Sequence, residues 1–152
     1  MKNKRTGFTL IELVVVVLII GILTSISMPY YYKTIETSKA TDSLALGHML
    51  GNAYRMYLLD NPGDTLSGSL SNDCNGKKCA DASGACKLVA CSYVAQQDWD
   101  SSSYIYSVGG SCGGAACTKR DGGSGNYSGW GYNFGMDGSC TPQGGAPDCP
   151  RF

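Results

Sequence analysis

Residues 8–32 read FTLIELVVVVLIIGILTSISMPYYY, and Glu12 carries the only charge in this stretch. As an α-helix of 1.5 Å rise per residue it would be about 37 Å long. That length exceeds the hydrocarbon core of a bilayer, which is roughly 30 Å thick. We therefore expect a helix over residues 8–32 that is long enough and apolar enough to cross a membrane.

The sequences on either side of this run differ sharply. Lys2, Lys4 and Arg5 precede it, and a basic flank of this kind stays in the cytoplasm, which predicts a single-pass protein with its N-terminus inside. The rest of the chain is polar and rich in glycine, and it contains eight cysteines without a Cys-x-x-Cys pair. Such usage favours disulfides in an oxidising compartment over a cytosolic metal site. We expect this part of the chain to lie outside the cytoplasm.

Three interpretations of the apolar run compete. It could be a secretory signal cleaved after Ser27, which would release a soluble, disulfide-rich binding protein beginning at Met28. It could be a permanent anchor, or cleavage could occur after Gly7 so that the whole helix stays on the mature protein. A carboxylate inside a membrane helix costs on the order of 2.5 to 3.5 kcal/mol, and neither a signal nor a plain anchor needs one. Glu12 therefore favours the third interpretation.

The start of this segment has a specific motif, Gly7-Phe8-Thr9-Leu10-Ile11-Glu12-Leu13, and the apolar run after it ends at Pro29 and Tyr30. Over about residues 1–33 this pattern resembles the N-terminal signature of type IV pilins and their pseudopilin relatives. The resemblance implies that a prepilin peptidase cuts between Gly7 and Phe8 and methylates the new N-terminus. It also implies that Glu12 is the glutamate required for assembly, and that Gly21 and Pro29 loosen and kink the helix.

The chemistry of Glu12 supports this role independently. Cleavage after Gly7 would free an α-amine on Phe8, and a neighbouring copy shifted along the helix axis could bring that cation to Glu12. Charges are tolerated in an apolar core only when they are paired. Apolar contacts alone do not define how far two helices slide, whereas this ion pair would. We predict that Phe8 and Glu12 together set the register between copies.

The pattern becomes amphipathic after the apolar run. Apolar residues recur at spacings of three and four, which predicts a helix that packs through one stripe as far as Leu59: Leu46, Met49, Leu50, Ala53 and Tyr57. Asp60-Asn61-Pro62-Gly63 then supplies a breaker. The predicted organisation is a leader peptide over 1–7, the apolar helix over 8–32, an amphipathic half over 33–59 and a globular head over 60–152.

The head is expected to be a small antiparallel sheet packed on the amphipathic half of the helix, which makes an α+β fold. Candidate strands are Leu88–Val94, Tyr104–Val108 and Gly129–Phe134. The last places three aromatic residues at period two, so that one aromatic face could cover the apolar stripe of the helix.

Eight cysteines provide four possible disulfides that would compensate for a small core. We favour Cys112 with Cys117 across a glycine-rich turn, and Cys140 with Cys149 around a C-terminal loop. The remaining four should pair among themselves: Cys74, Cys79, Cys86 and Cys91. If residues 88–94 are extended, Cys86 and Cys91 lie too far apart to bond to each other.

The sequence contains no recognisable motif of an enzyme active site, a cofactor site or a metal site. The chain has one histidine, His48, for which a packing or surface role is the better interpretation. Acids in the loops are better explained as solvated side chains than as calcium ligands: Asp60, Asp64 and Asp73. Short basic pairs do not make a nucleic-acid surface when the net charge is zero: Lys77-Lys78 and Lys119-Arg120. We expect a structural protein with no cofactor and no bound metal.

The sequence thus predicts a pilin that is stored in the inner membrane and then polymerised through its helix into an extracellular fibre. Its partners would be further copies of itself, the prepilin peptidase, and an inner-membrane assembly platform driven by a separate ATPase. A pseudopilin of a type II secretion system and a minor pilin remain alternatives. The role of the fibre in adhesion, twitching motility, DNA uptake, secretion or electron transfer stays open.

Overall fold

The computed structural model describes residues 7–123 and 125–150. The basic leader residues Lys2, Lys4 and Arg5, and the last two residues of the predicted head, lie outside the described residues. The chain forms two compact units that meet between Glu36 and Thr37. The four segments predicted from the sequence remain predictions.

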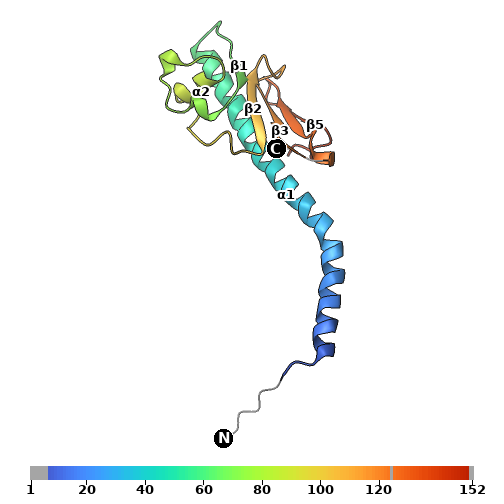
Figure 1. Cartoon of the computed structure of the whole chain (residues 1–152). Helices are drawn as coiled ribbons and strands as arrows, with labels where there is room; N and C mark the ends of the chain where they lie inside the picture. Colours follow the sequence, from blue (N-terminus) through green and yellow to red (C-terminus); the bar gives the residue numbers. More distant parts are fainter. Residues whose placement is uncertain (1–6, 124, 151–152) are drawn as a thin grey trace. The chain divides into compact units, whose positions relative to one another are not determined.

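One helix, α1, runs from Leu10 to Asp60 and contributes to both units (Figure 1). It starts two residues later than the expected Phe8, because Thr9 caps its first turn. It ends one residue beyond the expected Leu59, and Asn61-Pro62-Gly63 then turns the chain. Proline lacks the amide hydrogen that a continuing helix needs.

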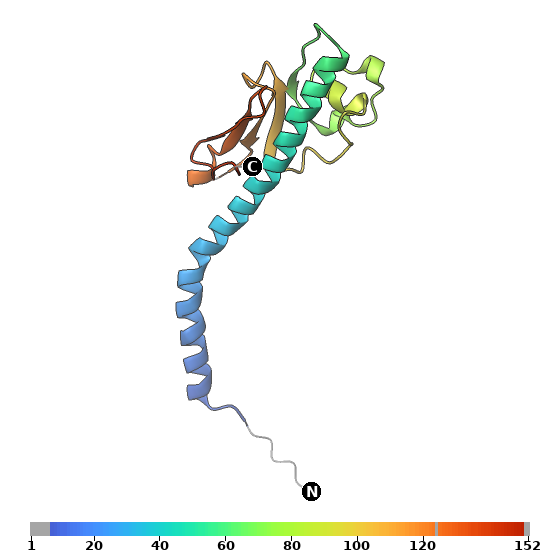
Figure 2. The same cartoon turned by 180° about the vertical axis from the view of Figure 1, so that it is seen from behind.

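The second unit contains a five-stranded antiparallel sheet in which each strand pairs with the next in sequence. The strands are β1 (Ser67–Ser69), β2 (Tyr104–Gly109), β3 (Ala116–Arg120), β4 (Gly131–Phe134) and β5 (Cys140–Gln143). Three short 3-10 turns, η1 (Asn72–Cys74), η2 (Cys79–Asp81) and η3 (Gly125–Tyr127), and one short helix, α2 (Cys86–Ala90), lie between them. The C-terminal part of α1 lies along one face of this sheet, as both views show (Figure 2).

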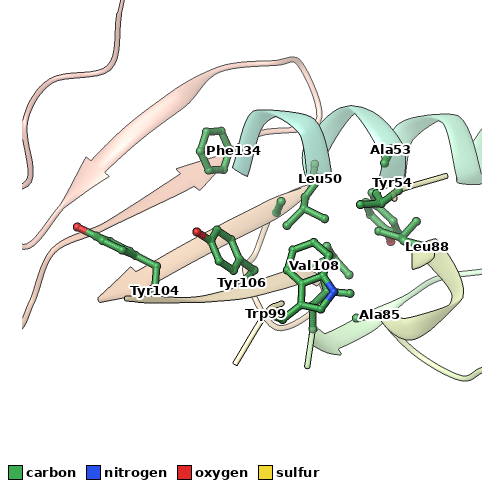
Figure 3. Close-up of a cluster of buried hydrophobic side chains, with 14 of the residues drawn as sticks. Leu50, Ala53, Tyr54, Ala85, Leu88, Trp99, Tyr104, Tyr106, Val108 and Phe134 are labelled. Atoms are coloured by element: carbon green, nitrogen blue, oxygen red, sulfur yellow. The ribbon is translucent and has the colours of Figure 1, made fainter. Parts of the chain in front are cut away.

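The core of this unit lies between α1 and the sheet. Alternate residues of β2 are buried, namely Tyr104, Tyr106 and Val108, and the last two lie on the side of the strand that faces Leu50 of the helix (Figure 3). The expected aromatic face of β4 is also buried, with Tyr132 and Phe134 each 1% exposed. The predicted α+β architecture, with a helix on an antiparallel sheet, is therefore confirmed.

Helix and sheet approach each other closely at Gly47. A Cβ atom at this position would lie 2.1 Å from Cε2 of Phe134 and 3.0 Å from Cγ2 of Thr118. Phe134 is enclosed by its own neighbours, and its ring makes an edge contact with His48 at 4.7 Å between centroids. The packing distance of α1 therefore depends on the missing side chain of Gly47.

The expected strand Leu88–Val94 is wrong. Residues Cys86–Ala90 form α2 instead, and the chain then turns through Ser92, whose φ is 65°. Leu88 and Val89 are both buried. A strand would point two successive side chains to opposite faces, whereas a helix places them about 100° apart and can turn both toward one core.

All eight cysteines are paired. The expected bridges Cys112–Cys117 and Cys140–Cys149 are present. The other two bridges interleave, because Cys74 bonds to Cys86 and Cys79 bonds to Cys91. The two interleaved bridges join the two ends of α2 to the turns η1 and η2. A helix of five residues is too short to be stable by itself, so these covalent links stabilise it.

Candidate functional site

The first turn of α1 carries the charged group of the apolar segment. Thr9 is the N-cap, and Glu12 is the third residue of the helix. The Thr9 amide donates a hydrogen bond to Oε2 of Glu12 at 2.8 Å, and the Thr9 hydroxyl donates to the same atom at 2.7 Å. The Glu12 amide donates in return to Oγ1 of Thr9 at 3.4 Å. This reciprocal pattern is a capping box.

Thr9 is not among the site residues predicted from the sequence. Its signal was present, since a threonine followed three residues later by glutamate marks a helix start. The capping box holds the Glu12 side chain against the first turn through one oxygen. Among the described residues nothing donates to Oε1, so the carboxylate keeps a second oxygen for a cation. Phe8, where the resemblance predicts the new amine, is the residue just before the cap.

The apolar segment is not covered by any of the residues that the structure describes. Every residue from Gly7 to Thr34 is exposed. Phe8 is 85% exposed, and the aliphatic side chains after it are mostly exposed by half or more. An apolar surface of this extent requires lipid or other protein. Among the described residues α1 is the one helix that has the length and composition to cross a membrane.

Polar side chains inside the apolar segment bond to the helix itself. The Thr24 hydroxyl donates to the carbonyl of Ile20 at 2.9 Å, and the Ser25 hydroxyl donates to that of Ile22 at 2.8 Å. These bonds satisfy the hydroxyl groups within the helix itself, without a partner from solvent. Gly21 lies in the same stretch, and α1 is helical through Pro29. The predicted loosening and kink at Gly21 and Pro29 stay predictions.

The loop acids are not gathered together. Asp60 accepts a hydrogen bond from the Tyr93 hydroxyl at 2.7 Å. Asp64 accepts one from the Tyr57 hydroxyl and pairs with Nζ of Lys87 at 2.9 Å. The Tyr57 bond, followed by the Lys87 bond, holds the pKa of Asp64 below its usual value. These acids therefore tie the end of α1 to the segment around α2.

His48 lies on α1 between the Phe134 ring and a cavity of about 410 Å³, and Asp148 lines the same cavity. Its Nε2 is buried and makes no hydrogen bond within the described residues. Burial, with a smaller contribution from the nearby charge of Arg55, lowers the pKa of His48 below its ordinary 6.5. The surroundings of His48 thus favour the neutral imidazole over the charged form.

We expect the head to lose stability as the pH falls through about 6.5, the ordinary imidazole pKa. Below that pH the unfolded chain binds a proton that folded His48 resists, so protonation favours unfolding; above it this effect disappears. Thermal midpoints of the full-length chain in detergent, at about pH 7.5 and about pH 5.5, bracket this transition. His48→Gln should reduce the difference between the two midpoints. An equal difference in both proteins would contradict the assignment to His48.

Comparison with known proteins agrees with this N-terminal arrangement. Residues 2–28 match the family described as the Prokaryotic N-terminal methylation motif. The chain is 34% identical over 80 residues to the fimbrial protein EcpC of Eikenella corrodens, a match that covers 51% of this chain and 52% of EcpC. It is 38% identical over 82 residues to a type IV major fimbrial protein, FimA, of Dichelobacter nodosus, with 51% of each chain covered. No solved structure matches the chain.

These matches are partial in extent, because the chain spans about half the length of the curated relatives it matches. The matching motif covers the apolar part of α1 with its capped Glu12, and the second unit places the rest of that helix on an antiparallel sheet. The chain thus combines a long helix, apolar over its N-terminal part, with a disulfide-bonded head. The N-terminal part of the chain matches the prokaryotic N-terminal methylation motif and is similar to that of type IV fimbrial proteins.

Proposed function

We propose that this chain is a structural subunit of a type IV pilus. In this proposal it is held in the inner membrane by the apolar part of α1, cleaved between Gly7 and Phe8, N-methylated, and polymerised into an extracellular fibre. The observation that carries the proposal is the exposed apolar helix headed by Glu12, which none of the described residues covers. Lipid can cover this surface before assembly, and the same segments of other copies can cover it afterwards.

The partners in this proposal follow from the chemistry of assembly. Moving an apolar helix out of lipid requires work, and the described residues have no phosphate-binding loop of the kind that nucleotides need. We therefore assign the energy source to a separate cytoplasmic ATPase acting through a membrane platform. The basic residues Lys2, Lys4 and Arg5 support an orientation with the N-terminus in the cytoplasm.

The mass of the mature N-terminus tests the processing step. We expect the protein recovered from cells to begin at Phe8 and to carry one additional methyl group on its α-amine. A Gly7→Val variant should keep the leader, because the cleavage site would be lost, whereas Gly21→Ala, which changes a glycine inside the helix, should be processed normally. A mature protein that begins at Met28 would mean a secreted soluble module and would overturn the proposal.

The abundance of the chain in sheared surface material separates the major pilin from the alternatives. A major pilin should dominate this material, whereas a minor pilin or a secretion pseudopilin should be present in small amounts. The similarity to type IV major fimbrial proteins favours the first outcome.

A further inference from the structure

The four disulfides differ in how accessible they are to solvent. Cys74 is completely buried, and its partner Cys86 is half-buried. The bridges Cys112–Cys117 and Cys140–Cys149 also join half-buried residues. Cys79 is the one exposed cysteine among the eight, all of which lie in the described part of the chain. The Cys79–Cys91 bridge is therefore the one that a molecule from solution reaches most easily.

This bridge also borders a cavity. Both of its cysteines line a space of about 270 Å³, together with Lys87, Tyr57 and Tyr93. A water molecule occupies about 30 Å³ in the liquid, so the cavity has room for a small organic thiol beside the sulfur atoms. Thiol–disulfide exchange requires this kind of access, because the attacking sulfur must approach one sulfur of the bridge directly.

The two lysines that precede the exposed cysteine favour an anionic attacking group. Lys77 and Lys78 directly precede Cys79, and Asp81 follows two residues later, which leaves one net positive charge over residues 77–81. Lys87, on the cavity wall, donates hydrogen bonds to Asp64 at 2.9 Å and to the Tyr57 hydroxyl at 3.2 Å. These two contacts, the first being the larger, raise the pKa of Lys87 and keep it an ammonium ion.

We propose that Cys79–Cys91 is a thiol-exchange site that reacts with small anionic thiols. A thiolate attacks Sγ of Cys79 and forms a mixed disulfide there, while the Cys79–Cys91 bond breaks and Cys91 leaves as a thiolate. The leaving sulfur lies on the wall of the same cavity as Lys87 and takes a proton from water. A second thiol can attack the mixed disulfide, which leaves Cys79 and Cys91 as thiols and the two small thiols oxidised to their disulfide.

The surrounding structure can survive this reaction. Cys74 and Cys86 enclose Cys79 in sequence, and their own bridge keeps α2 joined to η1 when Cys79–Cys91 is open. Leu88 and Val89 hold the same helix in the core. Opening the exposed bridge thus frees the segment around η2 and leaves the sheet and α1 in place.

The rate of mixed-disulfide formation tests this proposal on the full-length chain in detergent. The protein is incubated with mercaptoethanesulfonate, quenched with iodoacetamide at successive times, and mapped by peptide mass spectrometry. We expect the mixed disulfide on Cys79 and the alkyl group on Cys91 to appear about tenfold faster than modification of the other six cysteines. Earlier modification at another bridge, or simultaneous opening of all four, would overturn the assignment.

A charge variant tests the preference for an anion. The double change Lys77→Gln and Lys78→Gln should slow the reaction with mercaptoethanesulfonate several-fold and leave the reaction with neutral 2-mercaptoethanol unchanged. Lys119→Gln, on β3, serves as the matched control and should change neither rate. Equal rates of the double variant and the wild type with the anionic thiol would contradict the electrostatic part of the proposal.

Discussion

Cells that produce the Glu12→Ala variant should contain the processed subunit in the membrane but almost no fibre. In the proposed fibre the α-amine of Phe8 in one copy is paired with Glu12 of another, inside a core of apolar helices. Removing one partner of a buried ion pair leaves the other unpaired, at a cost of about 3–5 kcal/mol for each contact. A fibre repeats this contact in every subunit, so its assembly should fail.

Three comparisons make this result specific. Glu36→Ala removes the same side chain from α1 outside the apolar segment, and we expect it to leave fibre yield near the wild-type value. Thr9→Val removes the capping hydroxyl and keeps the Glu12 charge, so it should weaken the first turn by about 1 kcal/mol and reduce fibre yield far less than Glu12→Ala. Sheared fibre is measured relative to membrane-bound subunit in each strain. A wild-type ratio for Glu12→Ala would contradict the pairing of Phe8 with Glu12.

The second large effect concerns the two helical glycines that face the sheet. Gly47→Ala should destabilise the head by about 1–3 kcal/mol, because the added methyl group would overlap the Phe134 ring in a packed core. Gly51→Ala is the matched control, since its Cβ would lie 3.6 Å from Cβ of Phe134, at ordinary contact distance. An alanine in a helix is favoured over a glycine by about 1 kcal/mol, so this change should be neutral or stabilising.

Thermal unfolding of the two full-length variants in detergent should therefore shift in opposite directions, or by clearly unequal amounts. Adding Phe134→Leu to Gly47→Ala should recover part of the loss, because the shorter side chain removes the overlap. Equal midpoints for Gly47→Ala and Gly51→Ala would mean that the ring moves aside freely, and it would contradict the close approach described here.

Parts of the head could be predicted because their buried and exposed residues alternate regularly along the chain. Tyr104, Tyr106 and Val108 alternate with outward-facing residues, and the strand predicted there agrees with β2 to within one residue. The strands β1, β3 and β5 were not predicted. They are three to five residues long and are composed mainly of Ser, Gly, Thr, Lys, Pro and Gln, so their structure depends on pairing with neighbours and not on their own pattern.

The segment around α2 shows why a local pattern can mislead. Its run of Leu88, Val89 and Val94 has the composition of a short strand, and periodicity alone does not separate a buried strand from a buried helix when the segment is this short. Two interleaved disulfides and the burial of Leu88 and Val89 in the core stabilise a helix here instead of a strand. Thr9 was not predicted for a different reason, because its capping signal, a threonine three residues before a glutamate, lies inside the apolar run and two residues after its predicted cleavage site.

Hydropathy, one acid and a breaker by themselves determined the apolar helix, the place of Glu12 in it and the end of α1 near residue 60, since these features depend on contacts along the chain. The tertiary structure alone decided which of the first four cysteines pair, that residues 86–90 are helical, and that Gly47 faces Phe134. Each of those outcomes depends on segments that are distant in sequence and pack together in one small core. The pattern within a single segment does not identify the segment against which it will pack.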